Sequence, residues 1–426
     1  MREGIIFDWN EIDARRKPRH PFDLNDETLR DGVQSPSVVD PSITDKFELL
    51  SLMDSIGVRS VNIGLPGAGK RAFDDVVAQA KYIQKHKLKL QPNCAARTMV
   101  ADIGPVAEAA QRSGQKITVY TFIGSSPIRQ WAENWSLDFI QKTSADAIDF
   151  AVKEGLEVAY VTEDTTRSPP GTLDVLFRSA IDHGASRLVL CDTVGHATPV
   201  GARALVEWTR TLITAMGVDI AIDWHGHNDR GLAVVNAIAA LDAGANRLHA
   251  CGLGVGERVG NTAMDLLLLN LKLLGWIDND LTDLVRYVEK VSDATKVAIP
   301  VNYPLSGSDA FRTATGVHAA AIIKAKDKGD DWLADRVYSG VPAGDFGRQQ
   351  VIEIGHMSGM SNVRFWLAQR HIPATDELCQ RILRTAKTTG WTLSEKEILK
   401  LIKPSAPVKK QPKARPVKKA VKRARA

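Results

Sequence analysis

Eight short runs of apolar and β-branched residues recur along the first part of the chain, and this repeat constrains the fold more than any other feature. The runs centre on residues 22–24, 60–63, 88–91, 117–121, 158–161, 188–191, 220–224 and 247–251. A loop and a stretch of helical periodicity follow each run. Consecutive runs lie about 28 to 40 residues apart, enough for a strand, a loop and a helix. Strands that alternate with helices predict βαβ units and a parallel sheet.

The stretches between the runs carry apolar residues on one side, as helices packed on a sheet require. Leu205, Trp208, Leu212 and Met216 recur at steps of three or four and therefore share a helix face. Eight strand–helix units in about 255 residues match the size of a (β/α)8 barrel. An open doubly wound sheet is the alternative, but no Gly-x-Gly-x-x-Gly follows the first strand. We therefore expect an α/β protein with a TIM barrel.

The repeat stops near residue 276, and the composition changes again close to the C-terminus. We expect an N-terminal extension over residues 1–20, the barrel over 21–275, a smaller and mostly helical region over 276–402, and a disordered tail over 403–426. The tail holds ten Lys or Arg residues and no acid, so residues 1–402 carry a net charge of −5 although the whole chain totals +5. Like-charge repulsion and proline favour disorder there.

Several classes of protein are excluded by what the sequence lacks. Four cysteines do not make a disulfide framework. No run approaches the roughly 18 apolar residues that a membrane span needs. The first twenty residues mix acids with bases and have no apolar core, which is unlike a targeting signal. We expect a cytoplasmic protein, with weak nucleic-acid contact through the basic tail as a remote hypothesis.

Chemistry in such a barrel is expected at the C-terminal ends of the strands. The seventh run ends in His225 and His227, which point to the same side if the backbone is extended. The first run is followed by an acidic stretch, Asp26-Glu27-Thr28-Leu29-Arg30-Asp31. Two imidazoles and one carboxylate can form a metal site with open positions for substrate. A single His-x-His also fits two structural histidines in a polar loop.

Three motifs in this order resemble the metal-dependent barrel enzymes of the isopropylmalate synthase and homocitrate synthase family, from about residue 21 to about residue 370. They are Thr28-Leu29-Arg30-Asp31-Gly32-x-Gln34, His225-x-His227-Asn228-Asp229 and Gly254-x-Gly256-Glu257-Arg258-x-Gly260-Asn261. Shorter segments around Glu163, Thr193 and His318 are also similar to the family. Gln34-Ser35-Pro36 and Thr121-Phe122-Ile123 bring the sequence closer to the isopropylmalate branch.

The resemblance implies a role for each matching residue. The metal ligands would be Asp31, His225 and His227, with Asn261 at or beside the metal. The catalytic residues would be Arg30, which polarises the reacting carbonyl, Glu163 and His318, which transfer protons, and Tyr338. The residues that contact substrate would be Gln34, Tyr120 and Thr193. In the family the post-barrel histidine and tyrosine come from the partner subunit, so the resemblance also implies a homodimer.

The implied reaction is a Claisen-type condensation of acetyl-CoA with a 2-oxo acid, assisted by a divalent cation such as Mg, Mn or Zn. The branch implies 2-oxoisovalerate as the acceptor and 2-isopropylmalate as the product, the first step of a leucine-biosynthesis type of pathway. The family's long leucine-sensing domain is not expected in this chain, and therefore neither is feedback through it.

Alternatives remain open at this stage. Val33 and Tyr120 depart from the usual isopropylmalate synthase pattern near the expected substrate position, so homocitrate or citramalate synthesis is an alternative. A metal-dependent lyase or aldolase of the same barrel type is another, although Gly254–Arg258 stands where the lyases carry a reactive cysteine. A barrel without activity, whose working part is the basic tail, is the last.

Overall fold

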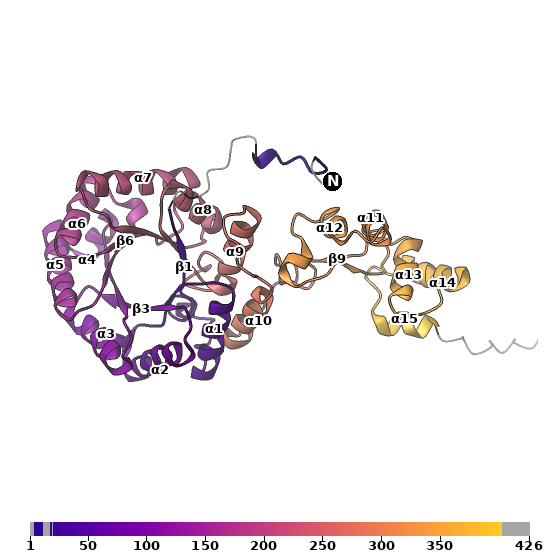
Figure 1. Cartoon of the computed structure of the whole chain (residues 1–426), viewed down its shortest axis with the longest axis horizontal. Helices are drawn as coiled ribbons and strands as arrows, with labels where there is room; N and C mark the ends of the chain where they lie inside the picture. Colours follow the sequence, from indigo (N-terminus) through magenta and orange to yellow (C-terminus); the bar gives the residue numbers. More distant parts are fainter. Residues whose placement is uncertain (1–3, 12–17, 19, 403–426) are drawn as a thin grey trace, which may run out of the picture. The chain divides into compact units, whose positions relative to one another are not determined.

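The computed structural model describes residues 4–11, 18 and 20–402. Eight parallel strands close into a barrel in sequence order, and helices surround the ring (Figure 1). The predicted (β/α)8 barrel is confirmed. The strands are β1 (Asp23–Asp26), β2 (Ser60–Asn62), β3 (Gln91–Arg97), β4 (Thr118–Gly124), β5 (Val158–Glu163), β6 (Arg187–Asp192), β7 (Ala221–Gly226) and β8 (Arg247–Ala250).

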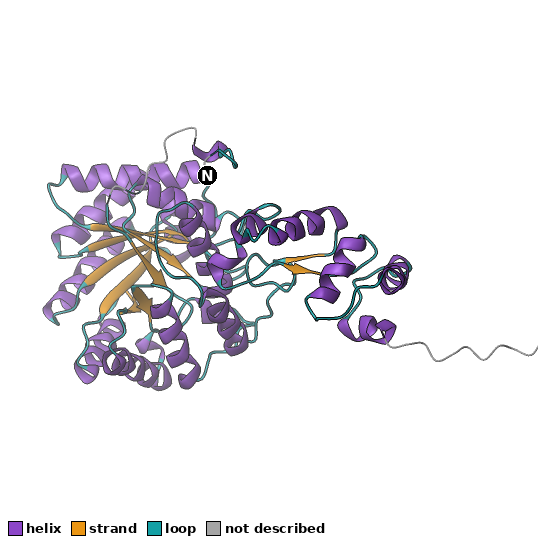
Figure 2. Cartoon of the chain, turned by 45° about the vertical axis from the view of Figure 1, so that its right-hand side comes forward, coloured by secondary structure: helices purple, strands orange, loops and turns teal. Residues whose placement is uncertain are grey.

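The helices of the barrel follow the strands in turn, and Figure 2 shows them outside the strands. They are α1 (Ile43–Ser55), α2 (Lys70–His86), α3 (Val100–Ser113), α4 (Pro127–Glu133), α5 (Leu137–Lys153), α6 (Pro170–Asp182), α7 (Pro199–Ala215), α8 (Ala233–Ala243), α9 (Met264–Leu273) and α10 (Leu284–Thr295). The third predicted strand is displaced, since residues 88–91 only lead into β3. The polar Asn93 hides that strand in the sequence, but its amide is buried against Asn25 and Ser60.

The barrel closes where its first and last strands meet. Asp23 to Asp26 of β1 pair with Arg247 to Ala250 of β8, and β1 also pairs with β2. α10 belongs to the same body, because Tyr287 hydrogen-bonds Asp26 and Thr28 beside β1. Large side chains fill the space between strands and helices, among them Trp224, Tyr160 and Phe177, all fully buried. This packing fixes the strand ends that carry the candidate site.

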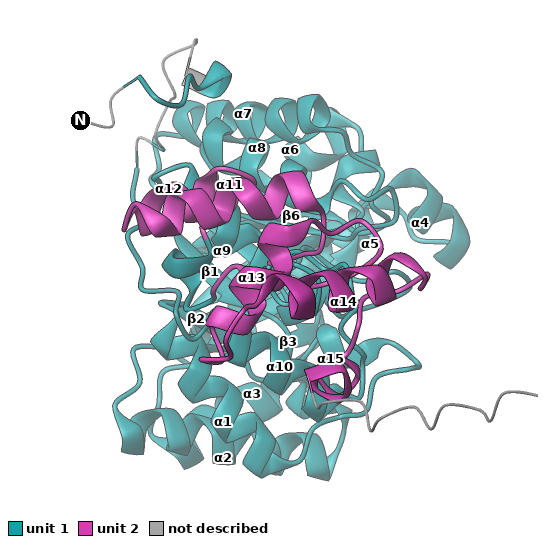
Figure 3. Ribbon diagram, turned by 90° about the vertical axis from the view of Figure 1, so that its right-hand side faces the viewer, with its two compact units in different colours: residues 1–310, 343–348 teal, residues 311–342, 349–426 magenta. Residues whose placement is uncertain are grey.

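The chain divides into two compact units (Figure 3). The first comprises residues 1–310 and 343–348, and the second comprises 311–342 and 349–426. The elements of the second unit are β9 (Arg312–Thr313), α11 (Gly316–Asp327), α12 (Asp331–Arg336), β10 (Val351–Ile352), α13 (Met360–Ala368), α14 (Asp376–Lys387) and α15 (Glu395–Ile402). The short strands β9 and β10 are parallel, and the core of α13 to α15 is built around Trp366, Leu367 and Ile382.

Two sequence expectations fall wholly or partly outside what the structure describes. The tail over residues 403–426 lies outside the described residues, and the extension over 1–20 is described only in part. Among the described helices, none combines the length and the apolar composition needed to cross a membrane.

Candidate active site at the mouth of the barrel

The three predicted metal ligands converge although they are far apart in the sequence. The Oδ2 atom of Asp31 lies 3.3 Å from Nε2 of His225 and 3.7 Å from Nε2 of His227. The two Nε2 atoms are themselves 3.3 Å apart. All three side chains are buried. The site therefore joins the end of β1 to the end of β7.

The backbone explains this convergence. His225 and His227 are separated by one residue at the end of an extended strand, so both rings project to the same side. Asn261, in the loop after β8, forms a backbone bridge with His227. Its Nδ2 atom donates a hydrogen bond of 2.9 Å to Asp31. The structure thus brings all four residues of the predicted metal site together.

The donor set fits a divalent cation. Ligand atoms of Asp31, His225 and His227 all lie within 4.8 Å of one another. Two imidazole nitrogens 3.3 Å apart repel each other unless a proton or a cation lies between them. The buried Oδ1 atom of Asn261 has no hydrogen-bond partner among the described residues and is a further available oxygen. Mixed nitrogen and oxygen donors of this kind suit Zn²⁺, Mn²⁺ and related ions.

The electrostatics of the two histidines differ. Burial alone lowers the pKa of His225, but the carboxylates of Glu27 and Asp31 beside it raise that pKa to about 9. Burial, and after it the neighbouring His225, lowers the pKa of His227 to about 4. A bound cation requires both rings to be neutral, so metal binding here should displace a proton from His225.

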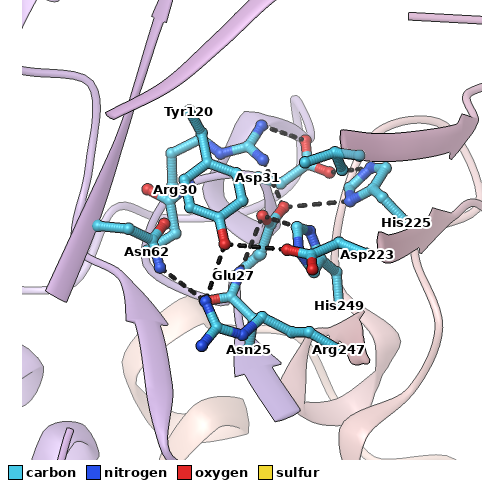
Figure 4. Close-up of polar contacts among 12 residues, drawn as sticks. Asn25, Glu27, Arg30, Asp31, Asn62, Tyr120, Asp223, His225, Arg247 and His249 are labelled. Carbon is cyan, nitrogen blue, oxygen red and sulfur yellow. Dashed lines mark hydrogen bonds and ion pairs between the residues drawn. The ribbon is translucent and has the colours of Figure 1, made fainter. Parts of the chain in front are cut away.

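Sequence reasoning missed a second pair of buried residues behind this face. Oε2 of Glu27 lies 3.3 Å from Nδ1 of His225, and Oε1 lies 3.0 Å from Nδ1 of His249 (Figure 4). Nε2 of His249 lies 3.0 Å from Asp223. Glu27 therefore contacts the nitrogen of His225 that faces away from Asp31. A carboxylate in that place orients the ring and fixes which nitrogen is free to bind metal.

We expect Glu27→Gln to weaken divalent-cation binding by roughly 10- to 100-fold, because loss of an orienting carboxylate costs about that much. Glutamine keeps the volume of the side chain but removes the negative charge that pairs with Arg30, His225 and His249. Titration calorimetry with Mn²⁺ and Zn²⁺ measures the affinity directly. An affinity within threefold of the wild type would contradict this role for Glu27.

The remaining barrel residues of the prediction surround one cavity of about 280 Å³. Its walls include Arg30, Gln34, Tyr120, Glu163 and Thr193, together with the metal face. An apolar side of the same cavity is formed by Ala95, Phe122, Val161, Val189 and Cys191. The structure therefore places all the predicted barrel residues except Asn261 in the cavity wall, and Asn261 adjoins it through Asp31.

Individual contacts define what these residues can do. Arg30 pairs with Glu27 and lies 3.4 Å from Asp31, so its charge stands beside the metal face. Burial raises the pKa of Glu163, while Arg129 at 3.6 Å acts in the opposite direction. A carboxyl group of raised pKa is a better proton acceptor than an ordinary one.

Two substrate-contact predictions look different in the structure. The hydroxyl of Tyr120 donates to Asp223 and accepts from Arg247, so only its ring is free to contact a ligand. The hydroxyl of Thr193 accepts a hydrogen bond from the backbone of Asp164, which holds it at the cavity wall. Neither network was visible in the sequence, because its members come from different strands or from the loops that follow different strands.

The predicted post-barrel residues belong to the second unit. The rings of His318 and Tyr338 stack on each other with centroids 4.1 Å apart. Tyr338 is 47% exposed. The two residues form a stacked aromatic pair, and their contribution to the reaction stays a prediction.

Comparison with known proteins agrees with this geometry. The HMGL-like family model matches residues 22–291. The homocitrate synthase of Methanopyrus kandleri is 30% identical over 370 residues, 86% of this chain and 87% of that protein. The 2-isopropylmalate synthase of Pyrococcus abyssi is 31% identical over 306 residues, 70% of this chain and 61% of that protein.

A solved structure shares the fold alone. The hydroxymethylglutaryl-CoA lyase of Pseudomonas aeruginosa superposes with a TM-score of 0.54 at 20% identity, covering 64% of this chain and 92% of the lyase chain. The identities to the two synthases are too similar to separate their branches, so the predicted preference for the isopropylmalate branch is not decided by them.

Proposed function

This chain belongs to the HMGL-like family, and within it to the homocitrate and isopropylmalate synthases, and from that premise we propose that it condenses acetyl-CoA with 2-oxoisovalerate to form 2-isopropylmalate. The class of enzyme, an acetyl-CoA-dependent synthase acting on a 2-oxo acid, follows from the family. The choice of acceptor is our proposal, and it depends on the walls of the cavity.

The apolar side of the cavity is the observation that carries this choice. Phe122, Val161 and Val189 offer a surface for a branched aliphatic side chain. An acceptor such as 2-oxoglutarate would have to place a second carboxylate here. The two arginines in the wall are already engaged, Arg30 by Glu27 and Arg258 by Asp229. An unpaired carboxylate in a partly buried site is costly.

The residues of the cavity suit the steps of the condensation. A divalent cation held by Asp31, His225 and His227 would supply Lewis-acid stabilisation for the oxygen atoms of the 2-oxo acid. Arg30 contributes a permanent positive charge where negative charge grows on the former keto oxygen. The Thr193 hydroxyl lies in the same wall and can bind the acceptor carboxylate.

Proton transfer falls to the acidic and post-barrel residues in this proposal. Glu163 accepts a proton from the acetyl methyl group, and the resulting carbanion forms the new bond to the keto carbon. The keto oxygen takes up a proton, and water then releases CoA from the thioester. His318 and Tyr338 are proposed to assist from the partner subunit of a homodimer, as the family resemblance implies.

Release of CoA from acetyl-CoA, detected with a thiol reagent, tests the proposal directly. We expect the highest kcat/KM with 2-oxoisovalerate. Pyruvate, which lacks its two methyl groups, should be at least about 10-fold poorer, because each methylene contributes about 1–3 kcal/mol. EDTA should abolish the release.

The same assay is run with three further 2-oxo acids, which are 2-oxoglutarate, oxaloacetate and glyoxylate. A preference for 2-oxoglutarate would move the enzyme to the homocitrate branch and overturn the choice of acceptor. No release with any acid in the presence of Mg²⁺, Mn²⁺ or Zn²⁺ would overturn the condensation itself.

A further inference from the structure

Two residues before His225, β7 carries Asp223, and a layer of buried polar side chains gathers around it (Figure 4). Asp223 is fully buried. It accepts hydrogen bonds from Tyr120 of β4, at 3.0 Å, and from Arg187 of β6. Its Oδ2 atom also lies 3.0 Å from Nε2 of His249 in β8. Four strands therefore meet at one carboxylate, and none of its three partners is a predicted metal ligand.

Two arginines balance the charge of this layer. Arg187 pairs with Asp223. Arg247 pairs with Asp23 at 2.5 Å and donates a hydrogen bond of 2.9 Å to the hydroxyl of Tyr120. Buried charged groups are stable in a protein interior only when they are paired and hydrogen-bonded. Because each charge here has its partner, the layer can serve as a fixed support for the side chains that contact it.

His249 connects this layer to the metal face. The residue is 2% exposed and belongs to the wall of the cavity at the mouth of the barrel. Its Nε2 atom faces Asp223, and its Nδ1 atom lies 3.0 Å from Oε1 of Glu27. Oε2 of Glu27 lies 3.3 Å from Nδ1 of His225, the ring whose Nε2 atom faces Asp31. A continuous series of buried contacts therefore runs from Asp223 to a predicted metal ligand.

Glu27 has different partners at its two carboxylate oxygens. Oε2 pairs with Arg30 and faces His225. Oε1 faces His249 and accepts a hydrogen bond of 3.2 Å from Asn25. Nδ1 of His249 has no hydrogen-bond partner among the described residues, so its contact with Oε1 is electrostatic. Without this contact Asn25 alone would hold Oε1, and the carboxylate would be free to turn about the oxygen that Arg30 binds.

Packing holds the ring of His249 as well. Its centroid lies 5.6 Å from that of His225, and the two rings meet edge to face at 80°. The ring of Tyr120 lies 5.5 Å from that of His249. Rotation of the His249 ring would therefore break its contacts with Asp223 and Glu27 and also disturb two neighbouring rings.

We propose that His249 is a positioning residue of the metal site: Asp223 holds its ring, and the ring fixes the carboxylate of Glu27 that orients His225. The inference rests on the proposed function, because it concerns the divalent cation that the condensation uses. Within the described structure, no hydrogen bond or ion pair joins His249 to Asp31 or His227. Its effect on the cation must therefore pass through Glu27.

Titration calorimetry of the full chain with Mn²⁺ tests the proposal without any catalytic step. We expect His249→Gln to raise the Kd for Mn²⁺ about 10-fold, the lower end of what loss of an orienting group costs. A glutamine amide reaches the place of Nε2, so it keeps an N–H group for Asp223 and none for Glu27. The visible absorption of the Co²⁺-loaded protein, which reports the arrangement of the ligands, should change with it.

The matched control is His249→Asn at the same position. Its amide nitrogen takes the place of Nδ1 and keeps an N–H group for Glu27, while the contact with Asp223 is lost. Both variants replace a buried imidazole with a neutral amide, so a purely structural role predicts equal losses of affinity. We expect a Kd within threefold of the wild type and an unchanged Co²⁺ spectrum. Equal losses in the asparagine and glutamine variants would overturn the proposal.

A double variant tests the route through Glu27. If His249 acts through that carboxylate, Glu27→Gln/His249→Gln should bind Mn²⁺ as weakly as Glu27→Gln alone, within threefold. Losses that multiply would show that the two residues act independently and would overturn the proposal. Where His249→Gln does not fold, as judged by amide hydrogen exchange of β7 and β8, His249→Met takes its place with the same expected loss.

The stoichiometry of binding excludes or establishes a second role for His249. Nitrogen and oxygen atoms of Glu27, His225 and His249 also lie within 4.8 Å of one another. We expect one cation per chain in the wild type and in every variant. Two cations in the wild type and one in His249→Gln would make His249 a ligand itself and overturn the positioning role.

The outcome can be separated from the fate of the proposed function. Mn²⁺ affinity that depends on His249 as expected, without turnover on any 2-oxo acid, would leave the positioning role standing and refute the condensation. Turnover with 2-oxoisovalerate and a Kd for Mn²⁺ unchanged by His249→Gln would do the reverse.

Discussion

Replacing His225 with alanine should lower kcat/KM for the condensation by at least about 1,000-fold and weaken divalent-cation binding by more than about 100-fold. A loss of about 1,000-fold in rate is typical when a group that stabilises growing negative charge is removed. Loss of a residue that only orients a metal ligand weakens metal binding by up to about 100-fold, so loss of a ligand itself should weaken it more. The physical reason is geometric. His225 is the only residue of the metal face described here whose two ring nitrogens lie within 3.3 Å of two different carboxylates, Asp31 and Glu27.

The matched control is His183→Ala. His183 is the C-cap residue of α6, and its Nδ1 atom lies 2.7 Å from Asp149 at the surface. The control substitution therefore removes an imidazole that is paired with a carboxylate, and it leaves the mouth of the barrel unchanged. Metal content and titration calorimetry report on binding, and CoA release reports on turnover. A His225→Ala enzyme that keeps metal and turnover within tenfold of the wild type would contradict the assignment of the site.

Trp224→Ala should reduce the free energy of unfolding of the barrel by about 3–5 kcal/mol, the usual cost of deleting a large aromatic ring from a core. Trp224 precedes His225 in β7 and is fully buried. The ring lies close to the backbone after it, since a Cβ atom added to Gly226 would meet its Nε1 atom at 3.1 Å. The substitution therefore leaves a cavity directly behind the strand that carries His225 and leads into His227.

The control for this change is Trp131→Ala on α4, because that ring is 83% exposed. Its effect should stay within about 0.5 kcal/mol. The chain has two compact units, so a single unfolding transition is not assumed, and amide hydrogen exchange of β6, β7 and β8 provides the measurement. Equal protection of these strands in the two variants would show that the ring does not hold β7 in place.

The barrel could be predicted from the sequence, because the spacing of the apolar runs reflects the combined length of a strand, a loop and a helix. His225 and His227 could be placed for the same reason, since a known strand end fixes the direction of alternate side chains. Asp31 and Asn261 depended on the family resemblance. Neither residue lies in a strand, and the turns that bring Asp31 to within 3.7 Å of His227 leave no periodic pattern.

Glu27 and His249 show what the sequence could not reveal. Each is a polar residue in or beside an apolar run, and either could have faced solvent. Their contact follows from the pairing of β1 with β8, which places Asn25 opposite His249. Only closure of the ring brings Glu27 to both histidines. The two-residue strands β9 and β10 were missed for a simpler reason, because they are too short to produce an alternating pattern.

The position of the metal face also has a consequence for how the chain becomes a folded protein. Asp31 lies just after the first strand of the barrel, the two histidines lie at the end of the seventh, and β8 joins them. A nascent chain therefore cannot assemble this site until nearly the whole ring has been made and sealed. A cation bound there would link the residues after β1 to the end of β7 and so stabilise the closed ring. The stabilisation would grow with the logarithm of the cation concentration divided by its Kd.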